Sequence, residues 1–138
     1  MQVLPYLNFD GQCAEAFAFY EKLFGGKINF LMTFGESPMA DGIPVEDHGA
    51  IVHGTLELPG GALIQGSDAI GGRYNKPAGF MVSISPETDD KAEHIFKELV
   101  KGGVETMAMQ ETFWATRFGM LVDRFGIPWM INVNKPMN

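Results

Sequence analysis

Two segments of this sequence resemble each other and end in the same way. The first reads F-Y-E-K-L-F-G-G at residues 19–26. The second reads I-F-K-E-L-V-K-G-G at residues 95–103, with one extra residue before its glycines. An internal repeat constrains the fold strongly, because each copy must build the same supersecondary unit. The sequence therefore predicts a single domain over residues 1–138, built from a first module at 1–70 and a second at 77–138.

Each module is predicted to contain a strand, a helix and three further strands. Apolar residues in both helices recur at the spacing of one helical face, and a glycine pair ends each helix. The first module has predicted strands at 3–9, 28–34, 50–58 and 62–67, and a helix after Asp10, its expected N-cap. The second has strands at 79–85, 104–109, 118–123 and 127–133, and a helix at 88–101.

These elements predict an α+β fold of two tandem βαβββ modules with cupped mixed sheets and helices on the outer faces. A single module leaves one face of its sheet uncovered, so two sheets are expected to share a concavity that holds a ligand. Alternation in the segment 50–58 places Val52, Gly54, Leu56 and Leu58 on one face. It places Ile51, His53, Thr55 and Glu57 on the other, toward the expected ligand.

Composition excludes several classes of protein. The formal charge of −7 disfavours nucleic acid and anionic membranes as partners. No apolar run approaches the roughly 20 residues of a membrane span. The N-terminal residues show no secretory signal, and the single cysteine, Cys13, cannot form an internal disulfide. We therefore expect a cytoplasmic protein, with Cys13 as a small buried residue.

Three segments resemble one known family. They are P-Y-L-N-F-D-G near the start, E-A-F-A-F-Y-E-K-L-F-G-G in the first helix, and F-W-A-T-R-F-G-M-L-V-D-R-F-G-I-P-W-M-I-N near the end. Together they resemble the PhnB-like branch of the vicinal oxygen chelate superfamily, which includes glyoxalase I, extradiol dioxygenases and bleomycin resistance proteins. The resemblance implies paired βαβββ modules, a homodimer, and a cup that encloses a ligand or metal.

The resemblance also implies four metal-ligand positions, which this sequence fills poorly. Those in the first strand of each module fall near Leu4-Pro5 and Gly79-Phe80, and the closing one falls at Met130. Only His53 and Glu57 remain, and four residues of strand separate them by about 13 Å, too far to share one ion. The interpretation therefore assigns no cofactor and no metal ligand, with a divalent metal as the alternative.

Eight residues are the candidates for contact with a ligand. His53 can act as a general base or a hydrogen-bonding group, and the alternative is a histidine bonded within the sheet or at a dimer contact. Trp129 is predicted to lie in the core, with Met130 on the opposite face. The eight candidates are Tyr6, Asn8, His53, Thr55, Gln65, Trp114, Met130 and Asn132.

The resulting hypothesis is a homodimeric small-molecule binding protein that lacks the full metal-ligand set. One alternative is a metal-dependent isomerase, lyase or dioxygenase-type enzyme, and another is a protein that sequesters a bleomycin-type drug. Members of this branch are often labelled ubiquinone-pathway methyltransferases. The sequence does not support that label, because G-S-D-A-I-G-G-R-Y-N leads into a loop and not into the helix of a dinucleotide-type site.

Overall fold

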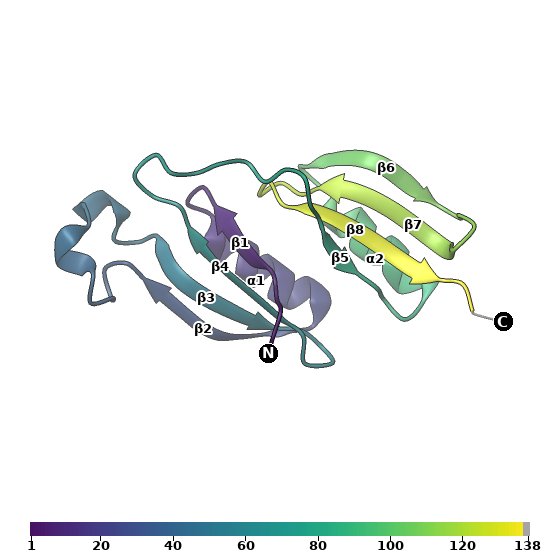
Figure 1. Ribbon diagram of the computed structural model, residues 1–138, viewed down its shortest axis with the longest axis horizontal. Coiled ribbons are helices and arrows are strands. Elements are labelled where there is room, and N and C mark those ends of the chain that lie inside the picture. The colour runs from purple at the N-terminus through teal and green to yellow at the C-terminus, as the bar shows by residue number, and fades with distance from the viewer. Residues whose placement is uncertain (137–138) are drawn as a thin grey trace. The chain divides into compact units, whose positions relative to one another are not determined.

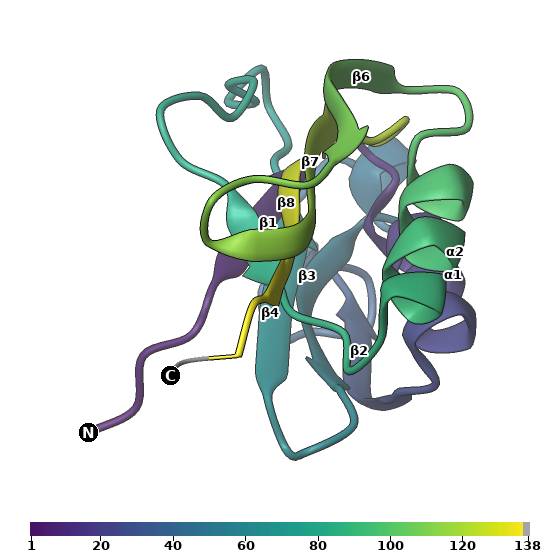
Figure 2. The same cartoon turned by 90° about the vertical axis from the view of Figure 1, so that its right-hand side faces the viewer.

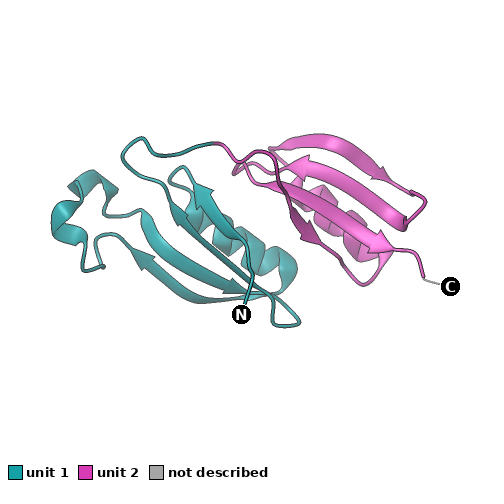
Figure 3. Ribbon diagram, viewed as in Figure 1, with its two compact units in different colours: residues 1–75 teal, residues 76–138 magenta. Residues whose placement is uncertain are grey.

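The computed structural model describes residues 1–136 and divides into two compact units, residues 1–75 and residues 76–138 (Figure 3). Each unit is a four-stranded sheet with one α-helix against one face (Figures 1 and 2). No helix within residues 1–136 has the length and apolar character needed to cross a membrane.

The two units have the same order of elements and the same strand order. Unit 1 contains β1 (Tyr6–Phe9), α1 (Cys13–Phe24), β2 (Lys27–Thr33), the short helices η1 (Ala40–Gly42) and η2 (Val45–Asp47), β3 (Ile51–Glu57) and β4 (Leu63–Asp68). Unit 2 contains β5 (Val82–Ile84), α2 (Asp89–Leu99), β6 (Val104–Gln110), β7 (Ala115–Val122) and β8 (Pro128–Asn134). The sheets run β1-β4-β3-β2 and β5-β8-β7-β6, with the first pair parallel and the others antiparallel. The predicted α+β fold with two βαβββ modules is thus confirmed.

Several predicted element ends were wrong. Strand β1 begins at Tyr6 and not at residue 3, and β5 is only three residues long. Strand β7 begins at Ala115, before the predicted residue 118, because Ala115 pairs with Asn134 at the far end of β8. Helix α1 begins at Cys13 with Gln12 at its N-cap, so Asp10 does not cap it. Local sequence missed these ends because distant segments of the chain decide them.

Close packing of the helix on the sheet depends on glycines in the third strand of each unit. Gly54 of β3 lies beneath the Phe17 ring of α1, where an added Cβ would come within 3.1 Å of that ring. Gly119 of β7 lies beneath Phe96 of α2, where an added Cβ would come within 3.0 Å of the ring. Any larger side chain would push the helix away from the sheet. These contacts define the helix-covered face and leave the other face of each sheet free of helix.

A bulge in β3 corrects one predicted orientation. Thr33 pairs with Ile51 and Met32 pairs with His53, so Val52 is an extra residue in β3. Ile51 is therefore buried with Gly54 on the helix-covered face and not on the face of His53. The alternation predicted for residues 50–58 holds from His53 onward and fails at the bulge.

A buried carboxylate replaces the predicted cap of α1. Asp68, at the end of β4, is only 4% exposed. Its Oδ1 accepts a hydrogen bond from the Cys13 backbone N–H at 2.9 Å, and its Oδ2 accepts one from the Ile51 N–H at 2.8 Å. One side chain thus joins the start of α1, the start of β3 and the end of β4, and it satisfies an otherwise orphaned helix N–H.

In unit 2, Asp123 is a buried carboxylate with a comparable structural role. It follows β7 and is buried, and its Oδ1 accepts hydrogen bonds from the backbone N–H groups of Phe125 and Ile127. Its Oδ2 accepts one from the Trp129 indole at 2.9 Å. Gly126 adopts a φ of 90° in this turn. Asp123 therefore shapes the β7–β8 turn and also holds Trp129, which is fully buried as predicted.

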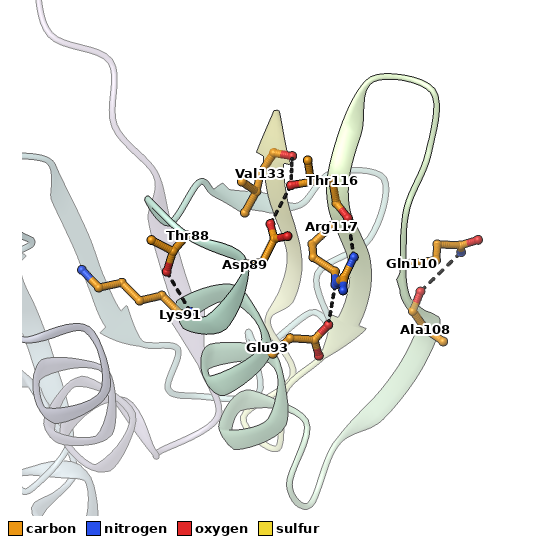
Figure 4. A network of polar contacts seen from close by, with 9 residues as sticks. All are labelled: Thr88, Asp89, Lys91, Glu93, Ala108, Gln110, Thr116, Arg117 and Val133. Carbon is orange, nitrogen blue, oxygen red and sulfur yellow. Dashed lines mark hydrogen bonds and ion pairs between the residues drawn. The ribbon is translucent and has the colours of Figure 1, made fainter. Parts of the chain in front are cut away.

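The first turns of α2 are bonded to the start of β7, as Figure 4 shows. The Thr116 hydroxyl donates to Asp89 at 2.6 Å, and Arg117 Nε donates to Glu93 at 3.0 Å. The Thr88 hydroxyl accepts from the Lys91 N–H and caps the helix. Acidic residues near the N-terminus of α2 complement the helix dipole, and Asp89 and Glu93 also tie the helix to its sheet.

Replacing Asp68 by Asn should destabilise unit 1. An amide has one acceptor oxygen, so it would leave either the Cys13 or the Ile51 N–H facing another donor. We expect a loss of about 2–4 kcal/mol in the free energy of unfolding, measured by urea titration. Asp41→Asn, at an exposed position in η1, is the control and should change nothing. Equal stability of the two variants would contradict the role given to Asp68.

Cys13 should make stability fall at alkaline pH. Burial, with a smaller effect from Asp68, raises the pKa of the thiol to about 12. The unfolded thiol loses its proton near pH 8.5, so between that pH and about 12 the unfolded chain binds fewer protons than the folded one. The free energy of unfolding should therefore fall by up to about 1.4 kcal/mol per pH unit more steeply than in Cys13→Ala. Urea titrations of both proteins from pH 8 to 10.5 measure this difference, and parallel pH profiles would refute it.

Candidate functional site

The helix-free face of unit 1 carries five of the predicted ligand residues. Strand register places them together, because Tyr6 pairs with Gln65, Gln65 pairs with Thr55, and Asn8 pairs with Ser67. The same register adds Phe30 and Met32, which pair with Thr55 and His53. We call this surface the unit 1 face. It consists of Tyr6, Asn8, Phe30, Met32, His53, Thr55, Gln65 and Ser67.

An aromatic cluster lies on the unit 1 face. The Tyr6 hydroxyl and His53 Nδ1 are 3.1 Å apart and hydrogen-bonded, and the two rings stack with centroids 5.7 Å apart. The Phe30 ring lies 5.9 Å from the His53 ring. Tyr6 and Phe30 remain 45% and 43% exposed. Three rings from β1, β3 and β2 thus form a partly exposed apolar surface with a polar group at its centre.

The direction of the hydrogen bond between Tyr6 and His53 determines whether His53 donates a hydrogen bond to a ligand or accepts one. If the Tyr6 hydroxyl donates to Nδ1, the other ring nitrogen, Nε2, carries the proton and is a donor. If Nδ1–H donates to the Tyr6 oxygen, Nε2 is an acceptor and a base. Within residues 1–136, Nε2 has no hydrogen-bond partner. His53 can therefore bind either a carbonyl or a hydroxyl group of a ligand.

The helix-free face of unit 2 carries the other three predicted residues. The Trp114 indole donates to Asn132 Oδ1 at 2.9 Å, and its ring lies edge-on to Phe118 at 5.1 Å. Phe118 pairs with Asn132, and Met130 is the next residue on the same face of β8. Trp114 is 40% exposed, while Phe118 beneath it is only 7% exposed. We call this surface the unit 2 face.

Sequence reasoning missed Phe30 and Phe118. In β2 the register shifts between Ile28 and Phe30, so simple alternation does not give the face of Phe30. Phe118 belongs to a strand whose start was predicted at that very residue, so its neighbours gave no alternation to follow. Both are aromatic residues within predicted strands, and this was the sequence feature that could have identified them.

His48 organises the loop before β3, because its Nε2 contacts the carbonyl oxygens of Ala40 and Ile43.

The donor set does not fit the divalent metal that the resemblance implies. Among residues 1–136 no three His, Cys, Asp or Glu side chains are grouped closely enough to hold an ion. Glu57, the one carboxylate on the strand of His53, accepts a hydrogen bond from Asn29 at 3.2 Å. The implied positions near Leu4-Pro5, Gly79-Phe80 and Met130 offer no oxygen or nitrogen side-chain ligand.

Comparison with solved structures supports the fold. The chain matches protein PA1353 of Pseudomonas aeruginosa with a TM-score of 0.86, 34% identity and 99% coverage of both chains. It matches the PhnB protein of Bacillus cereus with a TM-score of 0.80 and 21% identity, over 96% of this chain and 99% of that one. The fosfomycin resistance protein FosX of Listeria monocytogenes matches with a TM-score of 0.67 and 6% identity, over 98% and 94% of the two chains. The latter two likenesses concern the fold alone.

Comparison of sequences supports the family. The chain is 34% identical to protein YjdN of Escherichia coli, over 98% of this chain and 97% of that protein. A family model described as 3-demethylubiquinone-9 3-methyltransferase matches residues 1–132. The resemblance inferred from the three sequence motifs is thereby confirmed. The chain belongs to the family that this model describes.

Proposed function

We propose that this protein binds a small organic molecule without a resident divalent metal, and that the unit 1 face is its main binding surface. The observation that carries the proposal is the hydrogen-bonded pair of Tyr6 and His53, flanked by Phe30. Aromatic rings left in water on an open sheet gain free energy when an apolar surface covers them. The lack of metal is part of the proposal.

The chemistry of this surface favours a flat ring that carries a hydroxyl or carbonyl group. The ring would cover Tyr6 and Phe30, and its oxygen would bond to Nε2 of His53. Residues 1–75 contain nine acidic and three basic side chains, which gives a formal charge of −6. A neutral or cationic ligand therefore suits this unit better than a phosphate or another anion.

The proposal also assigns Trp114, Met130 and Asn132 to contact with a small molecule. Their support is the exposed indole, whose hydrogen bond to Asn132 fixes its position above Phe118.

The proposal does not include methyl transfer, the activity named in the description of the family. After β4, Gly71 and Gly72 form a turn that leads into irregular chain and then β5, whereas a dinucleotide-type cofactor site needs a helix at that point.

Binding of 1-naphthol, a flat ring with one hydroxyl, tests the unit 1 face. In a protein titration followed by NMR, we expect the largest shift changes at Tyr6, Phe30 and His53. His53→Ala should weaken binding by about tenfold, and Tyr6→Phe by roughly two- to tenfold, the equivalent of one hydrogen bond of about 0.5–1.5 kcal/mol.

The matched control is His94→Ala, at an exposed position of α2 in unit 2. It should bind the probe as the wild type does. The proposal fails if 1-naphthol does not bind at millimolar concentration, or if its affinity is the same in His53→Ala and His94→Ala.

We also propose that the protein is a homodimer, as the resemblance implies. The expected mass in light scattering at micromolar concentration is twice the chain mass of 15.2 kDa. A monomer that still binds 1-naphthol would remove the dimer from the proposal and leave the unit 1 face in place.

A further inference from the structure

Three methionines lie side by side across unit 2. Met107 of β6 pairs with Met120 of β7, and Met120 pairs with Met130 of β8. Ser83 of β5 completes the row beside Met130. Paired residues share a face, so the three methionines form a continuous row on the unit 2 face. All three are partly exposed, so they are not filling the core against α2.

The neighbouring positions on this face carry no charge. On one side of the row Val122 pairs with Pro128, and on the other Phe118 pairs with Asn132. Arg117, the nearest basic residue in β7, is bonded to Glu93 of α2 and is thereby engaged on the helix side. A cation at the methionine row would meet three thioether sulfurs and uncharged neighbours, without a fixed positive charge to repel it.

Thioethers select particular metals. A methionine sulfur is a soft, polarisable and uncharged ligand, and it prefers Cu(I) to hard cations such as Mg²⁺ or Ca²⁺. It also needs no proton release to bind. The chemistry of the row therefore differs from that of the hard or borderline divalent metal that the donor set of this chain does not fit.

We propose that Met107, Met120 and Met130 form a binding site for one Cu(I) ion. Directly opposed side chains on neighbouring strands have Cβ atoms about 4.5–5.5 Å apart, so Met120 is close to both of the others. The outer two lie about two strand spacings apart, roughly 10 Å. Each methionine has a flexible, unbranched side chain, so Met107 and Met130 can turn their sulfurs toward Met120 and enclose the ion.

The one thiol of the chain is poorly placed to compete. Cys13 is the only cysteine, is fully buried at the start of α1, and belongs to unit 1. His53 is a borderline ligand, and its Nδ1 is bonded to Tyr6. The Cu(I) site shares Met130 with the proposed function but none of the unit 1 residues that carry it. Binding of 1-naphthol at the unit 1 face and binding of Ag(I) at the methionine row can therefore fail separately.

Silver(I) is the probe for the test, because it has the same soft preference as Cu(I) and does not change oxidation state in air. The protein is the full chain with Cys13→Ala, labelled with ¹³C at the methionine methyl groups, in chloride-free buffer. We expect one Ag(I) per chain in native mass spectrometry. Of the nine methionine methyl signals, those of Met107, Met120 and Met130 should shift. Cu(I) under reductant should then shift the same three signals.

Met120→Leu is the deciding variant, since it keeps the side-chain volume and removes the central sulfur. It should weaken Ag(I) binding by more than about tenfold, the scale that even an outer-shell change costs a metal site. Met39→Leu, at a 55% exposed methionine of unit 1, is the control and should bind as the parent does. If Met120→Leu does not fold, Met107→Leu on the edge strand replaces it.

Three results would overturn the proposal. One is no uptake of Ag(I) at micromolar concentration. Another is a shift pattern in which Met39, an exposed methionine of unit 1, responds as strongly as the row. The third is an affinity unchanged by both Met120→Leu and Met107→Leu.

Discussion

Contact between a helical aromatic ring and a strand glycine determines the rest of the structure. Phe17 reaches the sheet of unit 1 at Gly54, and Phe96 reaches that of unit 2 at Gly119. Each contact fixes which face of the sheet the helix covers and therefore which side chains remain on the other face. His53 and Met120 are adjacent in sequence to these glycines, and alternation along the strand turns both of them away from the helix.

Two buried carboxylates hold the ends of these elements in register. Asp68 joins the starts of α1 and β3 to the end of β4, and Asp123 joins the β7–β8 turn to the Trp129 indole. Each accepts hydrogen bonds from donors that would otherwise be buried without a partner, and a buried charge is tolerated because it is satisfied in this way. The two residues are not at equivalent positions in the repeat. The units thus reach the same strand order with different anchors.

The two helix-free faces differ in chemistry although they share one topology. The unit 1 face has a stacked tyrosine and histidine with polar neighbours, while the unit 2 face has a methionine row and an indole held by an asparagine. After an internal duplication the helix-covered faces must keep packing, whereas the open faces are free to diverge. This difference motivates two separate proposals, an oxygen-bearing ring for unit 1 and a soft cation for unit 2.

The sequence by itself determined the repeat, the βαβββ order, the glycine that ends α1 and the burial of Trp129, because these depend on local periodicity and on backbone preferences of nearby residues. Helix α2 instead ends at Leu99, with Val100 at its C-cap, before the predicted glycine pair. It also indicated His53 and Tyr6 as candidates, through their residue types and strand positions. Only the tertiary structure decided that the two bond to each other, that Phe30 joins them, and that three methionines stand in register. It also showed that Ile51 lies on the helix-covered face. The first backbone N–H of α1, that of Cys13, donates to Asp68 and not to Asp10. The physical reason is that bulges and strand pairing depend on hydrogen bonds between segments far apart in the chain, which no local pattern specifies.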